Sequence, residues 1–196
     1  TAFKIDLLKN NKIKPVINKA KKFLKKIDIV IHAAGGGLGL KKSLIDNGDL
    51  NTIFQANLGA AAEINKCLIK LKKNKDTLHL VHVGSIASTE AVGSVGYNVV
   101  MSAYVKSIGR ELYKNNIIAS GILPGGFIAK GNAMERLKSK NLKDYNKFIK
   151  TRLPRKKMGS VNEILPMLLF LCSKHSSMMG GCLVPIDAGE GKAYQT

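Results

Sequence analysis

Three short apolar runs, separated by helix-length segments, limit this chain to a small set of folds. Residues 27–34, 77–83 and 117–123 are nearly continuous in apolar side chains, and each run has the length of a buried strand. Between them, residues 13–26 and 50–73 repeat apolar positions every three or four residues, which is typical of amphipathic helices. Buried strands that alternate with helices predict an α/β fold with a parallel sheet.

The rest of the chain extends this alternation. Residues 2–8 are expected to form a short strand, and residues 97–113 a helix rich in small side chains. Residues 130–150 are expected to form a polar, helical excursion, residues 161–173 a further helix, and residues 182–186 the last strand. We therefore expect one domain over the whole chain, built as a doubly wound, three-layer α/β/α sandwich.

The net charge of +19 raises the question of a nucleic-acid partner. Only Arg110, Arg136, Arg152 and Arg155 among the 32 basic residues are arginines, whereas nucleic-acid readers favour the guanidinium fork. The lysines fall between apolar positions, which favours solvated helix faces over a nucleic-acid site, although such a surface still attracts anions weakly. We expect no nucleic-acid partner.

Composition also bears on the compartment. No apolar run reaches the roughly 18 residues that a membrane span needs, and we expect neither a membrane partner nor a signal peptide. Cys67, Cys172 and Cys182 are too far apart to suggest a disulfide framework or a zinc site. These features together predict a cytoplasmic protein.

Glycine, proline and polar residues gather where the expected strands end. Residues 35–37 are all glycine after the first run, Ser85 follows the second, and residues 124–126 read Pro-Gly-Gly after the third. Because parallel sheets bind ligands beyond the carboxyl ends of their strands, these segments predict a ligand site at one edge of the sheet.

Six motifs stand along the chain in a fixed order. They are His32-Ala33-Ala34-Gly35, Asn57, Val83-Gly84-Ser85, Tyr97, Leu123-Pro124-Gly125-Gly126 and the segment 179–189. Each motif alone is weak, but their order and spacing resemble those of the short-chain dehydrogenase/reductase family over almost the whole chain. The resemblance implies a Rossmann-like fold and hydride transfer between NAD or NADP and a small-molecule carbonyl or alcohol.

The resemblance also assigns roles. Reduction of a carbonyl puts negative charge on oxygen, so an acid must supply a proton and a hydroxyl can polarise the bond. By resemblance, Tyr97 is the acid/base, Ser85 orients the carbonyl, and Asn57 holds a water of a proton relay within a locally distorted helix. The resemblance places the cofactor against Asp6, Leu7, Ala33, Ala34, Gly35, Gly36, Pro124, Gly125 and Phe127. Without the resemblance, Asp6 is explained equally well as a turn residue. Gly35 and Gly36 are then explained equally well as part of a loop with no ligand.

Two departures from the family pattern stand out. The family has a lysine four residues after its tyrosine, where this chain has Met101, and Lys106 is half a helical turn out of phase. The sequence after Met101 looks displaced by about three residues, which favours a short deletion over a point substitution. The family's glycine-rich phosphate turn is also missing, so we expect a fragment that lacks the first strand–helix–strand portion.

Several alternatives stay open at this point. A non-catalytic relative that binds ligand or partner subunits would explain both departures. Family members are usually homodimers or homotetramers, and the excursion at 130–150 lies where the family places its substrate lid. His32, His79, His82 and His175 are expected to be structural or solvated, with His79 and His82 on opposite faces of their strand.

Overall fold

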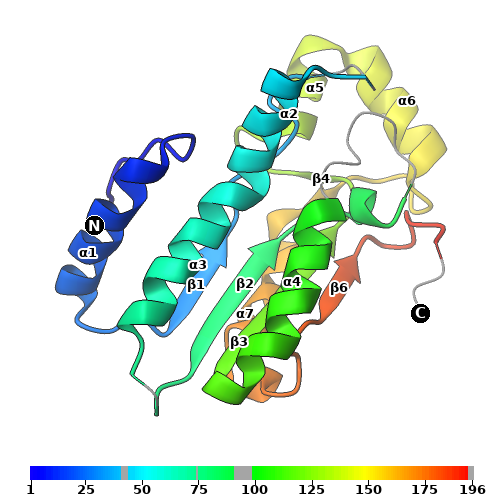
Figure 1. Cartoon of the computed structure of the whole chain (residues 1–196). Coiled ribbons are helices and arrows are strands. Elements are labelled where there is room, and N and C mark those ends of the chain that lie inside the picture. The colour runs from blue at the N-terminus through cyan, green and yellow to red at the C-terminus, as the bar shows by residue number, and fades with distance from the viewer. Residues whose placement is uncertain (41–43, 74, 91–98, 194–196) are drawn as a thin grey trace.

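Four parallel strands form the centre of the molecule (Figure 1). The structure, a computed structural model, describes residues 1–40, 44–73, 75–90 and 99–193. Within those residues the main sheet has the order β1-β2-β3-β6. Its strands are β1 (Ile29–His32), β2 (Leu78–Val83), β3 (Ile117–Pro124) and β6 (Leu183–Ile186). All neighbouring pairs are parallel, so every carboxyl end lies at the same edge.

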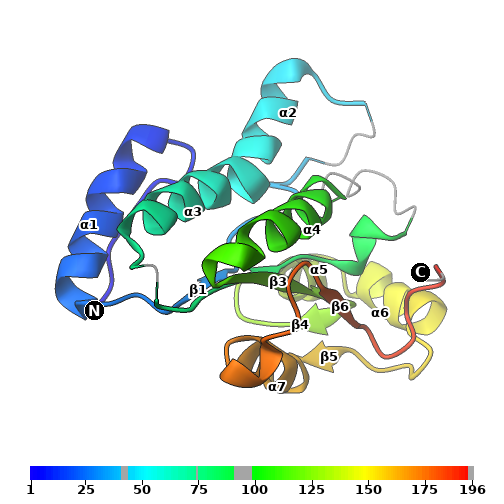
Figure 2. The same cartoon turned by 60° about the horizontal axis from the view of Figure 1, so that its bottom comes forward.

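Helices cover both faces of this sheet (Figure 2). On one face lie α1 (Ile13–Leu24), α2 (Asn47–Phe54), α3 (Ala60–Leu71) and α4 (Val99–Leu112), and on the other lies α7 (Val161–Leu171). A π-helical turn, Gln55–Gly59, joins α2 to α3. Short 3₁₀ turns occupy Asn10–Lys12, Ile86–Ser88, Tyr113–Asn115 and Lys174–Ser176. The three-layer α/β/α arrangement expected from the sequence is confirmed.

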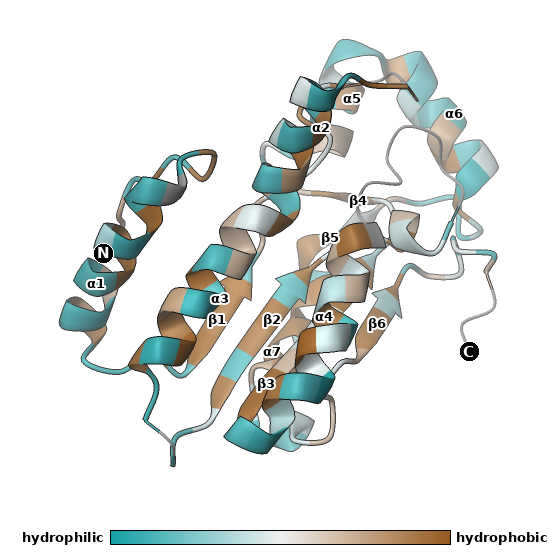
Figure 3. Ribbon diagram, in the orientation of Figure 1, coloured by the Kyte–Doolittle hydropathy of each residue, from teal (hydrophilic) through white to brown (hydrophobic). Residues whose placement is uncertain are grey.

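Alternation along the strands divides the core between the two faces. Leu80 and Ala119 face α3 and α4, whereas Val81 and Ile122 face α7. All four side chains are buried, and burial of a Val, Leu or Ile side chain stabilises a fold by about 1.5–3 kcal/mol. Figure 3 shows apolar colour along the strands and on parts of the helices that cover them.

A second packing unit lies beside the carboxyl edge of the sheet. The helices α5 (Ala133–Lys140) and α6 (Leu142–Arg152) pack around Tyr145, with Leu153 and Met158 completing a small apolar core. A two-stranded parallel sheet, β4 (Phe127–Ile128) with β5 (Gly159–Ser160), connects this unit to the main sheet. The helical excursion was predicted from the sequence, but the small sheet was not.

The prediction of a strand at residues 2–8 is wrong. The segment forms no strand; instead the Asp6 carbonyl accepts the Lys9 N–H at 3.1 Å and the Asp6 carboxylate accepts the Leu8 N–H at 3.1 Å, which makes a turn. A strand needs a neighbour for its N–H and C=O groups, and no described strand other than β2 pairs with β1. Without a ladder partner, local turn bonds prevail.

The long helix predicted over 50–73 is present, but it starts earlier and is interrupted. Asp46 caps it, because its side chain accepts the Asp49 N–H at 2.9 Å. The π-turn then breaks the regular hydrogen-bond ladder at Asn57. The local distortion that the family resemblance implied at this residue is therefore present.

Candidate active site

Asn57 fixes the turn that follows β1. Its side-chain Oδ1 accepts the Gly36 N–H at 2.7 Å, and its Nδ2 donates to the Gly36 carbonyl at 3.0 Å and to the Ile53 carbonyl at 2.9 Å. The side-chain amide thereby bonds with both backbone groups of one glycine. The π-turn places Asn57 within hydrogen-bond distance of Gly36. The glycine turn after β1 and the interruption of the helix, which are distant in the sequence, therefore meet at this contact.

The glycines of this turn have conformations that suit close backbone approach. Gly35 and Gly36 have φ values of +148° and +114°, which L side chains rarely adopt. A Cβ on Gly35 would lie 2.5 Å from Asn57 Oδ1, whereas Gly36 has open space around its α-carbon. Ala33 and Ala34, which lead into the turn, are exposed. A bare, exposed backbone at the carboxyl end of β1 fits a bound dinucleotide.

Asp6 and Leu7 lie against the same helix interruption. The Gln55 side chain, at the start of the π-turn, donates from Nε2 to the Leu7 carbonyl at 3.0 Å. Leu7 is half-buried, and the exposed Asp6 carboxylate lies 3.9 Å from the Lys9 ammonium. Asp6 acts as a turn residue here, which is the alternative that the sequence left open, and it stands next to the candidate cofactor edge.

Ser85 ends β2 and begins a 3₁₀ turn. Its Oγ accepts the Ala87 N–H at 3.2 Å, and the Ser85 carbonyl accepts the Ser88 hydroxyl at 2.9 Å. The side chain is half-buried. In this cap Oγ serves as a hydrogen-bond acceptor. The hydroxyl proton itself has no acceptor among the described residues, so it can be donated to a ligand oxygen.

The turn after β3 is packed from three sides. Gly125 donates its N–H to the Ile186 carbonyl at 3.0 Å, and Gly126 donates to Glu190 Oε2 at 2.5 Å. A Cβ on Gly125 would lie 2.8 Å from Asp187 Cβ, so only glycine fits. Pro124 is buried and Phe127 half-buried, the latter against the α7 core.

Glu190 is a site residue that sequence reasoning missed. It is 5% exposed, and burial raises the pKa of its carboxyl, while the Gly126 N–H and the Arg152 guanidinium act in the opposite direction. Arg152 Nη2 lies 3.7 Å from Glu190 Oε1. A single glutamate after a glycine carries no signal of burial, so the sequence gives no means of finding it.

Met101 brings two of the predicted site segments together. It is 6% exposed and packs in a cluster with Leu58, the neighbour of Asn57. A Cβ built on Gly84, the neighbour of Ser85, would lie 3.1 Å from Met101 Cε. The start of α4 therefore lies between the π-turn and the end of β2. Tyr97, the predicted acid/base, stands two positions before the first residue of α4 in the sequence and lies outside the described residues.

Lys106 does not take the place of the missing family lysine. It is exposed, and its backbone and Cδ lie near Gly181, before the start of β6. Gly181 bonds to Ala119 in the middle of β3, away from the carboxyl edge. The phase of Lys106 relative to Tyr97 stays a prediction, because Tyr97 lies outside the described residues.

A buried polar cluster lies just inside this edge, and the sequence did not predict it. The rings of His32 and His82 stack with centroids 4.5 Å apart, and His82 meets the Tyr104 ring edge-on at 5.9 Å. Asn65 links the cluster, since its Oδ1 lies 2.7 Å from His32 Nε2 and its Nδ2 donates to Tyr104 Oη at 3.1 Å. Burial lowers the pKa of His82 to about 3, and neither of its ring nitrogens has a partner among the described residues.

The prediction that His79 and His82 lie on opposite faces of their strand is confirmed. His79 lies on the opposite face of β2 from His82, because its Nδ1 lies 3.1 Å from the Leu171 carbonyl of α7. Within the described part of the chain, no three His, Cys, Asp or Glu side chains come together as a metal site. The described helices include none that is long and apolar enough to cross a membrane.

A cleft of about 280 Å³ opens on the α7 side of the turn after β3. Gly125, Phe127 and Asp187 line it together with Arg155 and Ser160. Asn57 and Ser85 do not line it. Residues of the turn after β3 thus face a cavity, while Asn57 and Ser85 lie outside it.

Known proteins resemble this chain in sequence and in fold. Residues 1–190 match the family model described as enoyl-(acyl carrier protein) reductase. FabG, the 3-oxoacyl-[acyl-carrier-protein] reductase of Buchnera aphidicola subsp. Baizongia pistaciae, is 28% identical over 95% of this chain and 75% of its own length. The 2-dehydro-3-deoxy-D-gluconate 5-dehydrogenase of Formosa agariphila is 25% identical over 95% of this chain and 71% of its own. A 7α-hydroxysteroid dehydrogenase complexed with NADH superposes with a TM-score of 0.84 at 21% identity, over 96% of this chain and 73% of that one.

The fold and its carboxyl edge define the class, a dinucleotide-binding α/β protein. Within that class the chain belongs to the short-chain dehydrogenase/reductase family, because the family model covers nearly all of it. It is an NAD(P)-dependent oxidoreductase, as the members of this family are.

Proposed function

We propose that this chain reduces a small-molecule carbonyl, or oxidises the corresponding alcohol, at the edge formed by Asn57, Ser85 and the Pro124–Gly126 turn. The observation that carries the proposal is the position of Met101, which packs against the neighbours of both Asn57 and Ser85. Two segments that are far apart in sequence thereby meet at one place, as a shared reaction site requires.

The cofactor fits the glycine turn after β1. Gly36 has a positive φ and open space at its α-carbon, so a ligand can approach the backbone there. We assign Asp6, Leu7 and residues 33–36 to the adenosine half, and Pro124, Gly125 and Phe127 to the nicotinamide half. When bound, NAD(P) supplies or accepts the hydride.

The chain's own residues handle the oxygen and its proton. The Ser85 hydroxyl, with its oxygen already an acceptor for Ala87, donates to the substrate oxygen and orients it. Tyr97 supplies the proton as acid/base. Both N–H groups of the Asn57 side chain are engaged, with the carbonyls of Gly36 and Ile53, so we assign its part in a proton relay to its backbone carbonyl in the π-turn.

The substrate is a carbonyl or alcohol that reaches the edge beside α5 and α6, which we propose as the substrate lid. A panel with one 3-oxoacyl thioester, one keto-sugar acid and one keto-steroid samples the chemistry of the relatives. We expect NADH or NADPH oxidation with at least one of them. No oxidation with any of the three, in a sample that binds the cofactor, would favour a ligand-binding role without catalysis.

We further propose that the protein works as a homodimer or homotetramer in the cytoplasm. Leu50 and Phe54 on α2 and Val100 on α4 are exposed apolar side chains on neighbouring helices, which suits a helical interface between two copies. Light scattering during gel filtration would detect a dimer or tetramer, and cell fractionation would test the compartment. A monomer at micromolar concentration would rule out the assembly.

A further inference from the structure

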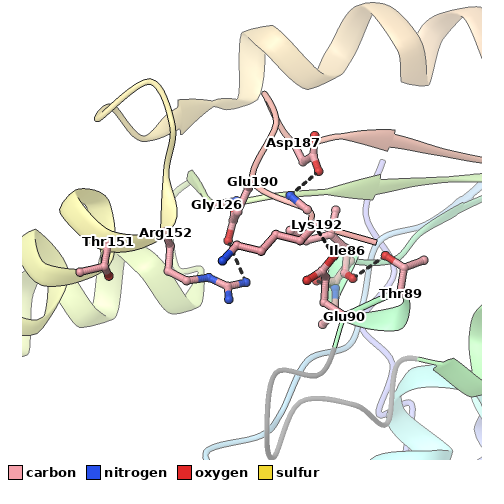
Figure 4. Close-up of polar contacts among 12 residues, drawn as sticks. Ile86, Thr89, Glu90, Gly126, Thr151, Arg152, Asp187, Glu190 and Lys192 are labelled. Carbon is pink, nitrogen blue, oxygen red and sulfur yellow. Dashed lines mark hydrogen bonds and ion pairs between the residues drawn. The ribbon is translucent and has the colours of Figure 1, made fainter. Parts of the chain in front are cut away.

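The C-terminal strap, residues 187–193, ties together three loops at the carboxyl edge (Figure 4). It follows β6 and is folded on itself, because Asp187 Oδ1 accepts the Gly189 N–H at 3.0 Å and Asp187 Oδ2 accepts the Gly191 N–H at 2.8 Å. Glu90, which lies beyond Ser85 in the loop after β2, accepts the backbone N–H groups of Lys192 and Ala193 at 2.5 and 2.7 Å. The strap thus lies against the loop that carries Ser85.

Glu190 extends this linkage to the turn after β3. Its Oε2 accepts the Gly126 N–H at 2.5 Å, and its Oε1 lies 3.7 Å from Arg152 Nη2 at the end of α6. The Glu190 side chain is 4% exposed and that of Arg152 is 34% exposed. A nearly buried carboxylate therefore bonds the nicotinamide-side turn with one oxygen and faces the helical excursion with the other.

Position 126 has little room for a side chain beside this carboxylate. A Cβ there would lie 3.3 Å from Glu190 Oε2 and 2.8 Å from Phe148 Cε1 of α6. The turn is packed between the strap and the excursion, so the position of its backbone depends on both. Hydride transfer is sensitive to small displacements of the reacting atoms, and misplacement by about 1 Å can cost about a hundredfold in rate.

We propose that Glu190 is a positioning residue for hydride transfer, which fixes the Pro124–Gly126 turn against the strap and couples that turn to α6 through Arg152. The inference rests on the proposed function, because it takes the turn to be the nicotinamide side of the site. Glu190 acts through the backbone of Gly126 and touches neither substrate nor reacting atoms.

The two contacts of Glu190 can be separated by substitution. Glu190→Gln keeps an oxygen for the Gly126 N–H and loses the charge that faces Arg152, and Arg152→Gln removes the same pair from the other side. Glu190→Ala removes both contacts. Glu111→Gln is the matched control, because Glu111 is an exposed carboxylate that pairs with Lys114 at 2.7 Å far from the strap.

Steady-state kinetics with NAD(P)H and an accepted carbonyl give the first readout. We expect Glu190→Ala to lower kcat about tenfold, since a charge-assisted bond to a backbone N–H is lost, with little change in KM for the carbonyl. Glu190→Gln and Arg152→Gln should each lower kcat about threefold, and the double variant should be no slower than either. The proposal would be overturned if the losses of kcat in the two single variants multiplied in the double variant. It would also be overturned if a folded Glu190→Ala variant kept the kcat of the unaltered chain.

Hydrogen–deuterium exchange of peptides that cover residues 124–128 gives the second readout and needs no turnover. We expect exchange there to rise about tenfold in Glu190→Ala and to stay unchanged in Glu111→Gln. Unchanged exchange in Glu190→Ala would overturn the proposal, and so would faster exchange with no loss of kcat. These outcomes can be distinguished from failure of the proposed function. If the proposed function were wrong, the unaltered chain itself would reduce no carbonyl.

Discussion

The Asn57 side chain bonds both backbone groups of Gly36, with its Oδ1 2.7 Å from the Gly36 nitrogen and its Nδ2 3.0 Å from the Gly36 oxygen. This double contact joins the turn after β1 to the π-turn between α2 and α3. The turn has positive φ values and is exposed, so the amide of Asn57 supplies much of its order.

Asn57→Ala should weaken cofactor binding about tenfold, because the glycine turn loses its two fixing bonds and must be ordered by the ligand. The free energy of unfolding should fall by about 2 kcal/mol, since three hydrogen bonds are lost. Titration calorimetry with NADH and NADPH and urea unfolding measure both quantities. Asn51→Ala, an exposed change on α2, is the control, and unaltered affinity in Asn57→Ala would contradict the assignment.

Ser85→Ala should lower kcat about a hundredfold with little effect on the carbonyl KM, because a hydroxyl donor to the developing oxyanion is removed. Ser173→Ala is a matched control, since Ser173 also caps a 3₁₀ turn by accepting an N–H two residues on at 3.2 Å. Ser173→Ala should be the less stable of the two variants, because the Ser173 hydroxyl also donates to the Phe170 carbonyl at 2.7 Å. Equal kcat values would show that Ser85 has only a capping role.

Acid should destabilise the fold through His82. Burial holds the pKa of His82 at about 3 in the folded protein, against 6.5 for an ordinary histidine. The unfolded chain therefore binds a proton that the folded chain does not, and stability is lost as pH falls below about 6.5. At pH 5 the linked loss is roughly 2 kcal/mol.

His82→Leu should remove that part of the pH dependence and cost little at neutral pH, because it replaces by apolar atoms two buried nitrogens that have no hydrogen-bond partner in the described part of the chain. Urea unfolding at pH 7 and pH 5 measures the difference. His175→Gln, at an exposed histidine, should keep the pH dependence of the unaltered chain. Parallel pH profiles for His82→Leu and the unaltered chain would show that His82 takes up its proton as readily in the folded chain as in the unfolded chain.

Met101→Lys should not restore a family-like lysine. The position is 6% exposed among Leu58 and Val105, so an ammonium there has no water and no partner charge among the described neighbours. We expect the free energy of unfolding to fall by about 3 kcal/mol, with Met101→Leu nearly neutral. A Met101→Lys protein that is as stable as the original and faster in catalysis would show that the side chain reaches the site.

Periodicity and strand-end chemistry predicted the parallel sheet, its helices and the common edge of Ser85 and the Pro124–Gly126 turn. These features depend on local pattern and on the direction of parallel strands. The segment at 2–8 alternates like a strand but forms a turn, because alternation says nothing about whether a pairing neighbour exists.

Long-range side-chain contacts were beyond sequence reasoning. The stacked rings of His32 and His82 come from strands that are adjacent only in the fold. Glu190 meets Gly126 across 64 positions of the chain, and no local signal marks either as a partner. The role of Tyr97 stays a prediction, since it lies outside the described residues.

Transfer of deuteride to the product carbon from NADH or NADPH that carries deuterium at both C4 positions tests the central claim most directly. The account predicts that mass spectrometry finds one deuterium on the alcohol carbon formed from an accepted carbonyl, and that Tyr97→Phe and Ser85→Ala sharply reduce its rate of appearance. Product that forms without deuterium, or at the same rate in both variants, would contradict hydride transfer at this edge.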